Sequence, residues 1–162
     1  MKKISMIILF SAIASVQAQQ KEPTNKHFWN TVETSASPEK IWTIWTDVSQ
    51  WKTWDTGLKD ALMSDPFKLG AKGTIVSLEG RKSKFKVVEY EEGLSYTIKT
   101  KLPLGSLYVK RTLSTQSGKT IFTHEVWFKG LTGGLFAKRF GPKFRKMLPE
   151  VMLKIKQLAE SK

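Results

Sequence analysis

The sequence contains no cysteine and only two histidines. Without thiols the protein forms no disulfide, has no cysteine nucleophile and offers no thiolate ligand to zinc. A histidine site would need carboxylates that the sequence does not bring together, so we predict no metal. The glycine-rich segment GLTGG, residues 130–134, lacks the strand-to-helix setting, lysine or glycine spacing of a nucleotide loop. We expect it to be a hinge, and we predict no cofactor.

No apolar run is long enough to span a bilayer, which takes about twenty residues. The most apolar stretch, residues 4–16, follows Lys2 and Lys3 and leads to small residues that end at Ala18. This arrangement is typical of a secretory signal peptide. We therefore expect residues 1–18 to be cleaved and the mature protein to be periplasmic or secreted. A polar lead (residues 19–26) and one domain (residues 27–160) complete the predicted organisation.

Acidic residues are scarce, with 14 against 27 lysines and arginines, and the net charge is +13. Removing the two leader lysines leaves 25 basic residues against the same 14, a mature charge of +11. Such an excess favours an anionic partner, for example an acidic membrane surface or a carboxylate ligand. Nucleic acid is disfavoured, because a secreted protein seldom meets it and no recognition motif is present. A solvated basic surface with no specific partner is the alternative.

Four of the six tryptophans lie in the segment IWTIWTDVSQWKTWD, residues 41–55. Ser37 and Pro38 predict the start of a helix there, as its cap and its first residue. The apolar residues that follow have helical spacing and predict one buried face: Ile41, Trp45 and Val48. Trp51 and Trp54 continue this pattern in a second short helix.

Turn residues divide the chain after residue 58 into short strands. With a first strand at residues 27–34, we predict further strands at residues 59–64, 72–79, 83–91, 94–102, 105–116 and 119–129. The short turns between them indicate an antiparallel meander. A long amphipathic helix follows, with an apolar stripe made of Phe140, Phe144, Met147, Leu148, Val151, Ile155 and Leu158. Pro149 is expected to kink this helix.

Two-residue turns at residues 103–104 and 117–118 fix the strand register. They place Tyr96 opposite Arg111 and Arg111 opposite His124. The face that carries this row is otherwise apolar and is predicted to point inward: Leu94, Ile98, Leu107, Val109, Leu113, Phe122, Val126 and Phe128. The other face is predicted to point outward: Lys99, Lys101, Lys110, Thr112, Thr123 and Glu125.

A polar row therefore lies within the apolar face. A third two-residue turn, at residues 92–93, would place Glu89 opposite Tyr96, unless a bulge turns it outward. A buried arginine needs a partner, because an unpaired charge in an apolar interior costs several kcal/mol. We expect the partner of Arg111 to be either Glu89 or a molecule that enters the interior.

The order of elements resembles the helix-grip fold of the START-like (SRPBCC) superfamily, which includes the polyketide cyclase/dehydrase and lipid-transport family. The matching segments are SPEKIW (residues 37–42), TDV (residues 46–48), Trp51, WD (residues 54–55), KVVE (residues 86–89), THEV (residues 123–126) leading to Gly130, and LP (residues 148–149). The resemblance covers roughly residues 27–160.

The resemblance implies an α+β fold, in which a curved antiparallel sheet of about seven strands wraps around the long C-terminal helix. Two short helices follow the first strand. It also implies a deep apolar pocket for a lipid, sterol, polyketide or aromatic molecule, with Trp42 and Trp45 closing one end and Trp54 near the mouth. The residues expected to contact this small hydrophobic ligand are Tyr96, Arg111, His124, Ile98, Val109, Phe128, Trp54, Met147 and Val151.

The polar row has three interpretations. It holds the head group of an anionic ligand, it is a structural hydrogen-bond network, or it catalyses a reaction. In the catalytic case, which the resemblance to cyclases suggests, His124 acts as general base, Tyr96 as proton donor, and Arg111 stabilises an enolate or binds a carboxylate. Glu89 is a further candidate for a catalytic acid. We favour a binding protein, with an enzyme of cyclase/dehydratase type as the alternative.

The segment LFAKRF, residues 135–140, combines apolar and basic side chains. Phe136 and Phe140 would enter a membrane while Lys138 and Arg139 contact anionic headgroups. The alternative is that the phenylalanines pack inward on the sheet. A basic module that binds a membrane surface and no ligand is therefore the third functional hypothesis.

Overall fold

The computed structural model describes residues 22–161. The predicted leader, residues 1–18, lies outside the described residues, as do residues 19–21 of the polar lead. The described chain consists of β1 (His27–Thr34), α1 (Pro38–Thr46), the 3₁₀ helix η1 (Val48–Gln50), α2 (Trp51–Trp54), β2 (Leu58–Met63), β3 (Lys72–Ser77), β4 (Lys82–Glu91), β5 (Ser95–Leu102), β6 (Gly105–Gln116), β7 (Lys119–Gly130) and α3 (Gly133–Glu160).

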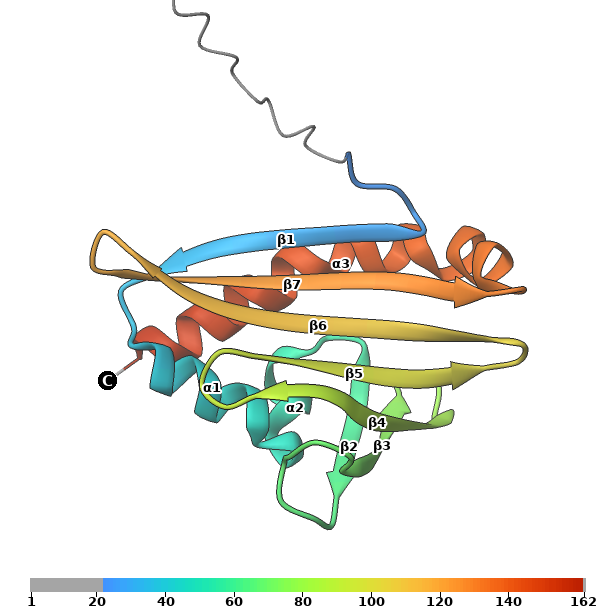
Figure 1. Cartoon of the computed structure of the whole chain (residues 1–162), viewed down its shortest axis with the longest axis horizontal. Helices are drawn as coiled ribbons and strands as arrows, with labels where there is room; N and C mark the ends of the chain where they lie inside the picture. The colour runs from blue at the N-terminus through green and yellow to red at the C-terminus, as the bar shows by residue number, and fades with distance from the viewer. Residues whose placement is uncertain (1–21, 162) are drawn as a thin grey trace, which may run out of the picture.

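The strands form one antiparallel sheet of seven in the order β1-β7-β6-β5-β4-β3-β2. Consecutive strands from β2 to β7 are neighbours, and the first strand pairs with the last. In Figure 1, α3 runs along one side of the sheet at β1 and β7, with α1 and α2 beside its C-terminal half. This is the predicted α+β helix-grip architecture, in which the sheet curves around a long C-terminal helix.

The register predicted from the two short turns is confirmed. Tyr96 pairs with Arg111, and Arg111 pairs with His124. The inner face is apolar around this row, with Ile98, Leu113, Phe122, Val126 and Phe128 all buried. Leu94 differs from its prediction, because it lies in the β4–β5 turn and is about half exposed.

β4 departs from the predicted register at one point. A bulge between Val87 and Glu89 shifts the pairing, so that Glu89 lies opposite Thr97 and Tyr90 lies opposite Tyr96. Because successive side chains of a strand point to opposite faces, one extra residue exchanges the faces of those beyond it. Of the two predicted alternatives for Glu89, the structure therefore shows the bulge that turns it outward, and not the placement opposite Tyr96.

The tryptophan helices belong to the core. The Ser37 hydroxyl accepts a hydrogen bond from the Lys40 amide at 3.4 Å, which caps α1 at its predicted start. Trp45, Trp51 and Trp54 are each at most 1% exposed. These three indoles belong to the hydrophobic core under the sheet. Their first role is therefore to pack the core.

α3 begins at Gly133, so its first turn includes two of the five residues expected to form a hinge. It continues through both Pro142 and Pro149. Most of the predicted apolar stripe faces the sheet, with Leu148, Val151 and Ile155 buried and Phe140 and Phe144 packed against the core. Leu158 is 39% exposed, which leaves an apolar side chain at the surface near the end of the helix.

Candidate functional site

The polar row crosses three neighbouring strands on the inner face of the sheet. Tyr96 on β5, Arg111 on β6 and His124 on β7 are 0%, 4% and 1% exposed. The Arg111 guanidinium donates from Nη1 to the Tyr96 hydroxyl oxygen. That hydroxyl donates in turn to the carbonyl oxygen of Trp45 at 3.1 Å. The row is therefore tied to the last turn of α1.

Aromatic rings enclose the guanidinium. Its Cζ lies 4.9 Å from the ring centroid of Trp54, 5.0 Å from that of Trp51 and 5.4 Å from that of Tyr96. The imidazole of His124 lies 5.3 Å from Trp45 and 6.4 Å from Trp54, measured between ring centroids. Cation–π contacts in a dry environment stabilise a cation by about 2 kcal/mol or more. The aromatic rings thus replace part of the stabilisation that hydration would give the Arg111 guanidinium.

Four buried polar atoms in this cluster have no hydrogen-bond partner: Arg111 Nε, His124 Nε2, Trp45 Nε1 and Trp54 Nε1. Leaving such a group unpaired costs about 1–3 kcal/mol each. The charge of Arg111 is also without an acidic partner, since none of the ion pairs found within residues 22–161 includes it. The interior around Arg111 therefore has unpaired donors that could bind an anionic hydrogen-bond acceptor.

Burial sets the protonation states of the row. Desolvation lowers the pKa of His124 well below its ordinary value of 6.5, and the nearby positive charge of Arg111 lowers it further. Desolvation raises the pKa of Tyr96 above 10.0, against the opposing effect of Arg111. At neutral pH the site consequently holds one cation, a neutral imidazole and a neutral phenol.

Two residues near the row were not predicted as part of it. Asp55 follows α2, and its carboxylate accepts a hydrogen bond from the Gly57 amide at 3.0 Å. Burial raises the pKa of Asp55, while the Gly57 amide and the charge of Arg111 oppose that rise. Asn30 on β1 pairs with His124 and extends the row by one strand. Extending the register to β1 would have found Asn30, whereas Asp55 reaches the row only through the tertiary fold.

Glu89 lies on the outer face and is not part of the site. Its carboxylate accepts a hydrogen bond from the Thr97 hydroxyl at 2.5 Å and lies 3.6 Å from Lys110 Nζ. These contacts lower its pKa, with the Thr97 hydrogen bond as the largest cause. An ionised carboxylate outside the sheet cannot donate a proton to a molecule inside it. The expected roles of Glu89 as partner of Arg111 and as a catalytic acid are thus wrong.

The other residues predicted to contact a ligand lie on the inner side. Ile98, Phe128 and Val151 are buried, and Val109 packs against the same core. Met147 faces the turn after α2, because a methyl group built on Gly57 would meet Met147 Cε at 2.8 Å. These residues already pack against one another or against neighbouring side chains, so a ligand would have to displace some of them.

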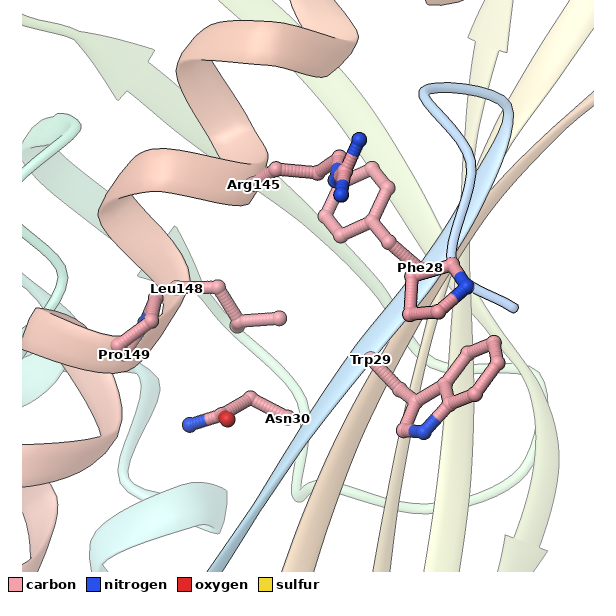
Figure 2. A pocket seen from close by; sticks show the side chains of 7 residues that line it. Phe28, Trp29, Asn30, Arg145, Leu148 and Pro149 are labelled. Carbon is pink, nitrogen blue, oxygen red and sulfur yellow. The ribbon is translucent and has the colours of Figure 1, made fainter. Parts of the chain in front are cut away.

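Among the grooves on the surface of the described part of the chain are two that Tyr96, Arg111 and His124 do not line. The smaller, of about 140 Å³, lies between β1 and α3. Figure 2 shows Asn30 and Phe28 on one side of it and Leu148 and Arg145 on the other. The larger, of about 510 Å³, lies among α1, α2 and the end of α3, and Trp54 lines it.

The structure gives no sign of a metal or a membrane span in the part it describes. No group of three or more side chains suited to holding a metal ion occurs within residues 22–161. The His27 imidazole forms a hydrogen bond with the Glu125 carboxylate on the outer face of the sheet. None of the helices described is both long and apolar enough to cross a bilayer.

The segment expected to touch a membrane is divided between two environments. Phe136 and Phe140 are partly buried, with ring centroids 5.9 Å apart, and Phe140 stacks on Phe144 at 6.3 Å. Lys138 and Arg139 are exposed. The phenylalanines thus pack mainly inward, and the leucines around them are the apolar side chains that reach the surface.

The family described as polyketide cyclase / dehydrase and lipid transport matches residues 26–160. The chain belongs to this family. The match agrees with the resemblance inferred from the motifs, and it extends over nearly all of the described structure. Small hydrophobic molecules are the ligands for which the polyketide cyclase/dehydrase and lipid-transport fold is known. Comparison with curated proteins finds no match.

Solved structures share the fold of this chain. A hypothetical protein of Helicobacter pylori has a TM-score of 0.69 at 10% identity, over 98% of this chain and 100% of that one. A protein of Mesorhizobium loti has a TM-score of 0.66 at 18% identity, over 82% of this chain and 96% of that one. DynU16, from the dynemicin biosynthetic locus, has a TM-score of 0.65 at 16% identity, over 86% of this chain and 48% of DynU16.

Proposed function

We propose that the protein binds a small amphiphile, with an apolar body and an anionic head, and that Arg111 binds the head. The observation that carries the proposal is the set of four unpaired buried polar atoms around an arginine without an acidic partner. Membership of a family whose fold binds small hydrophobic ligands supports the apolar part.

The chemistry of the unpaired atoms favours an oxyanion over a neutral head. Arg111 Nε and the indole nitrogens of Trp45 and Trp54 are donors only, so they require an acceptor. Hydrogen bonds from a charged donor to a carboxylate are roughly twice as strong as those between neutral groups. A carboxylate at this position would use the guanidinium charge together with the indole donors. Because the row is covered, binding includes movement of the aromatic side chains around it.

Isothermal titration of the mature protein with dodecanoate and with dodecan-1-ol tests the role of Arg111. The parent protein should prefer dodecanoate by about tenfold or more, a difference of about 1.4 kcal/mol. Arg111→Met removes the charge but keeps an apolar stem, and it should abolish that preference. Lys110→Met is the matched control, because it removes the neighbouring positive charge from the outer face. Equal dodecanoate affinity in parent and Arg111→Met, with both folded by circular dichroism, would refute the proposal.

Catalysis is the alternative use of the same site. The neutral imidazole of His124 with an unpaired Nε2 has the state required of a general base. The similar structure of DynU16, from the dynemicin biosynthetic locus, is consistent with polyketide-like substrates. Turnover of an aromatic polyketide that His124→Gln abolishes, with ligand affinity retained, would replace the binding function by a cyclase or dehydratase function.

A membrane surface is the second partner that we propose. Three leucines near the β5–β6 turn and the start of α3 are strongly exposed: Leu104 at 73%, Leu131 at 90% and Leu135 at 67%. The Thr132 hydroxyl donates to the Pro103 carbonyl and so holds the two segments together. Exposed basic residues surround them: Lys101, Lys129, Lys138 and Arg139. Leucines beside cationic side chains are suited to an anionic lipid surface.

The proposal also includes export through the leader predicted at residues 1–18. Mass spectrometry of the protein recovered from a periplasmic extract should give a chain that starts at Gln19. A chain that retains Met1 would contradict export.

A further inference from the structure

The larger groove has an apolar floor and a polar rim. Its lining comes from α1, from α2 with the turns before it, and from the last turns of α3. Ile44, Trp54 and Leu158 supply the apolar part, and Glu39, Lys40 and Asp47 are among the polar residues at the rim. The volume of about 510 Å³ is in the range of small-molecule sites.

Trp54 joins this groove to the buried polar row. It is fully buried and belongs to the lining of the groove, so it lies directly beneath the groove surface. Its ring centroid also lies 4.9 Å from the Arg111 guanidinium and 6.4 Å from the His124 ring centroid. A single indole therefore stands between the groove and the charged centre of the protein.

The two tryptophans of α2 are held differently. The Trp51 indole nitrogen donates to the Trp45 carbonyl oxygen at 2.9 Å. The corresponding nitrogen of Trp54 has no partner, although it is buried. α2 itself is only four residues long. Of the two indoles that cover Arg111, Trp54 is thus the one that can move without breaking a hydrogen bond of its side chain.

We infer that the groove among α1, α2 and the end of α3 is the outer subsite for the amphiphile, and that Trp54 is the gate between it and Arg111. The apolar body of the ligand lies against Ile44 and Leu158, while its anionic head passes the displaced indole and reaches the guanidinium. This inference rests on the proposed function, because it names the route and the second subsite of the same ligand.

Filling the groove from an exposed position tests the subsite without disturbing the core. Leu158→Trp should lower dodecanoate affinity by at least about tenfold, the loss expected when roughly two methylene groups remain in water. Hexanoate, with its shorter body, should be affected less. Leu153→Trp is the matched control, because Leu153 is 51% exposed on the same helix and does not line the groove. Its affinity should stay within about twofold of the parent.

The gate is tested by the rate of association of 11-(dansylamino)undecanoate in stopped-flow fluorescence. Trp54→Phe should increase this rate severalfold. Trp127→Phe should leave it unchanged, because Trp127 stacks on Tyr108 on the outer face of the sheet and does not contact Arg111. Unchanged affinity in Leu158→Trp and an unchanged rate in Trp54→Phe, with dodecanoate still bound through Arg111, would overturn the outer subsite alone. A parent protein that binds neither dodecanoate nor the dansyl probe would overturn the proposed function and this inference together.

Discussion

Arg111 is a cation held in a dry interior by rings instead of by a carboxylate. Its direct polar contact is the Tyr96 hydroxyl, and two indoles cover its faces. Removing charges from water costs several kcal/mol per ion. Within the described residues Arg111 forms no direct ion pair, and the charge of Asp55 acts on it only without contact. The retention of a buried, weakly compensated charge is easier to explain by a ligand than by stability.

His124 should make the stability of the protein depend on pH. The unfolded chain takes up a proton near the ordinary pKa of 6.5, whereas the folded chain, with its lowered pKa, does not. Unfolded protein therefore binds more protons, and the free energy of unfolding falls as pH decreases from about 7.5 to 5.5, by at most about 1.4 kcal/mol per pH unit. Urea denaturation at several pH values measures this slope.

The variant His124→Gln supplies the control for that slope. It keeps a neutral polar side chain that does not titrate, so its stability should vary less with pH over the same window. The carboxylates with lowered pKa values, such as Asp60 and Glu160, lose their stabilising effect only at lower pH. An identical slope in parent and variant would show that His124 is not neutral and buried in solution.

The residues of the site divide into those that sequence can predict and those that it cannot. Tyr96, Arg111 and His124 could be aligned because two short turns fix the register of three long strands. The position of Glu89 could not be decided from the sequence, because a bulge depends on local backbone geometry that the side-chain pattern does not record. The contact of Trp54 with Arg111 joins α2 to β6, and such tertiary contacts depend on how the layers meet.

At the scale of helices and strands, the fold was predictable where apolar residues recur with one clear period or where the turn type is clear. The strands and α1 match their predicted positions closely because alternation and capping are local signals. Gly133 and Gly134 were expected to belong to a hinge, whereas they form the first residues of α3. Glycine is a poor helix former in isolation, but packing of the first turn against β7 overrides that preference.

α3 provides a matched pair of glycine substitutions. A methyl group built on Gly141 would lie 2.2 Å from the Asn25 carbonyl oxygen, so Gly141→Ala should lower the free energy of unfolding by about 1–3 kcal/mol. A methyl group on Gly134 meets nothing within 4 Å, so Gly134→Ala should be neutral or stabilising by up to about 1 kcal/mol. Urea denaturation compares the two. Equal effects would mean that α3 does not pack on the residues before β1 as described.

At the scale of the whole molecule, charge and exposed leucines make membrane binding testable. The double variant Leu131→Ser and Leu135→Ser should reduce co-sedimentation with vesicles containing phosphatidylglycerol by about tenfold, and added salt should weaken binding of the parent. Leu62→Ser with Leu69→Ser is the control, because these leucines are also exposed, at 57% and 62%, but lie in and after β2. Equal binding by both double variants would remove the leucines from the proposed membrane surface.

The pairing of β1 with β7 limits the order in which the sheet can fold during synthesis. His27 pairs with Trp127, a separation of 100 residues, and Thr34 pairs with Thr120 (Figure 1). The first strand to leave the ribosome must therefore wait for the last strand, and then for α3, before the β1 side of the sheet is complete. Long-range pairing of this kind is slow. The β1 side of the sheet consequently stays incomplete throughout most of the synthesis of the chain, and the proposed export would require such an unfolded state.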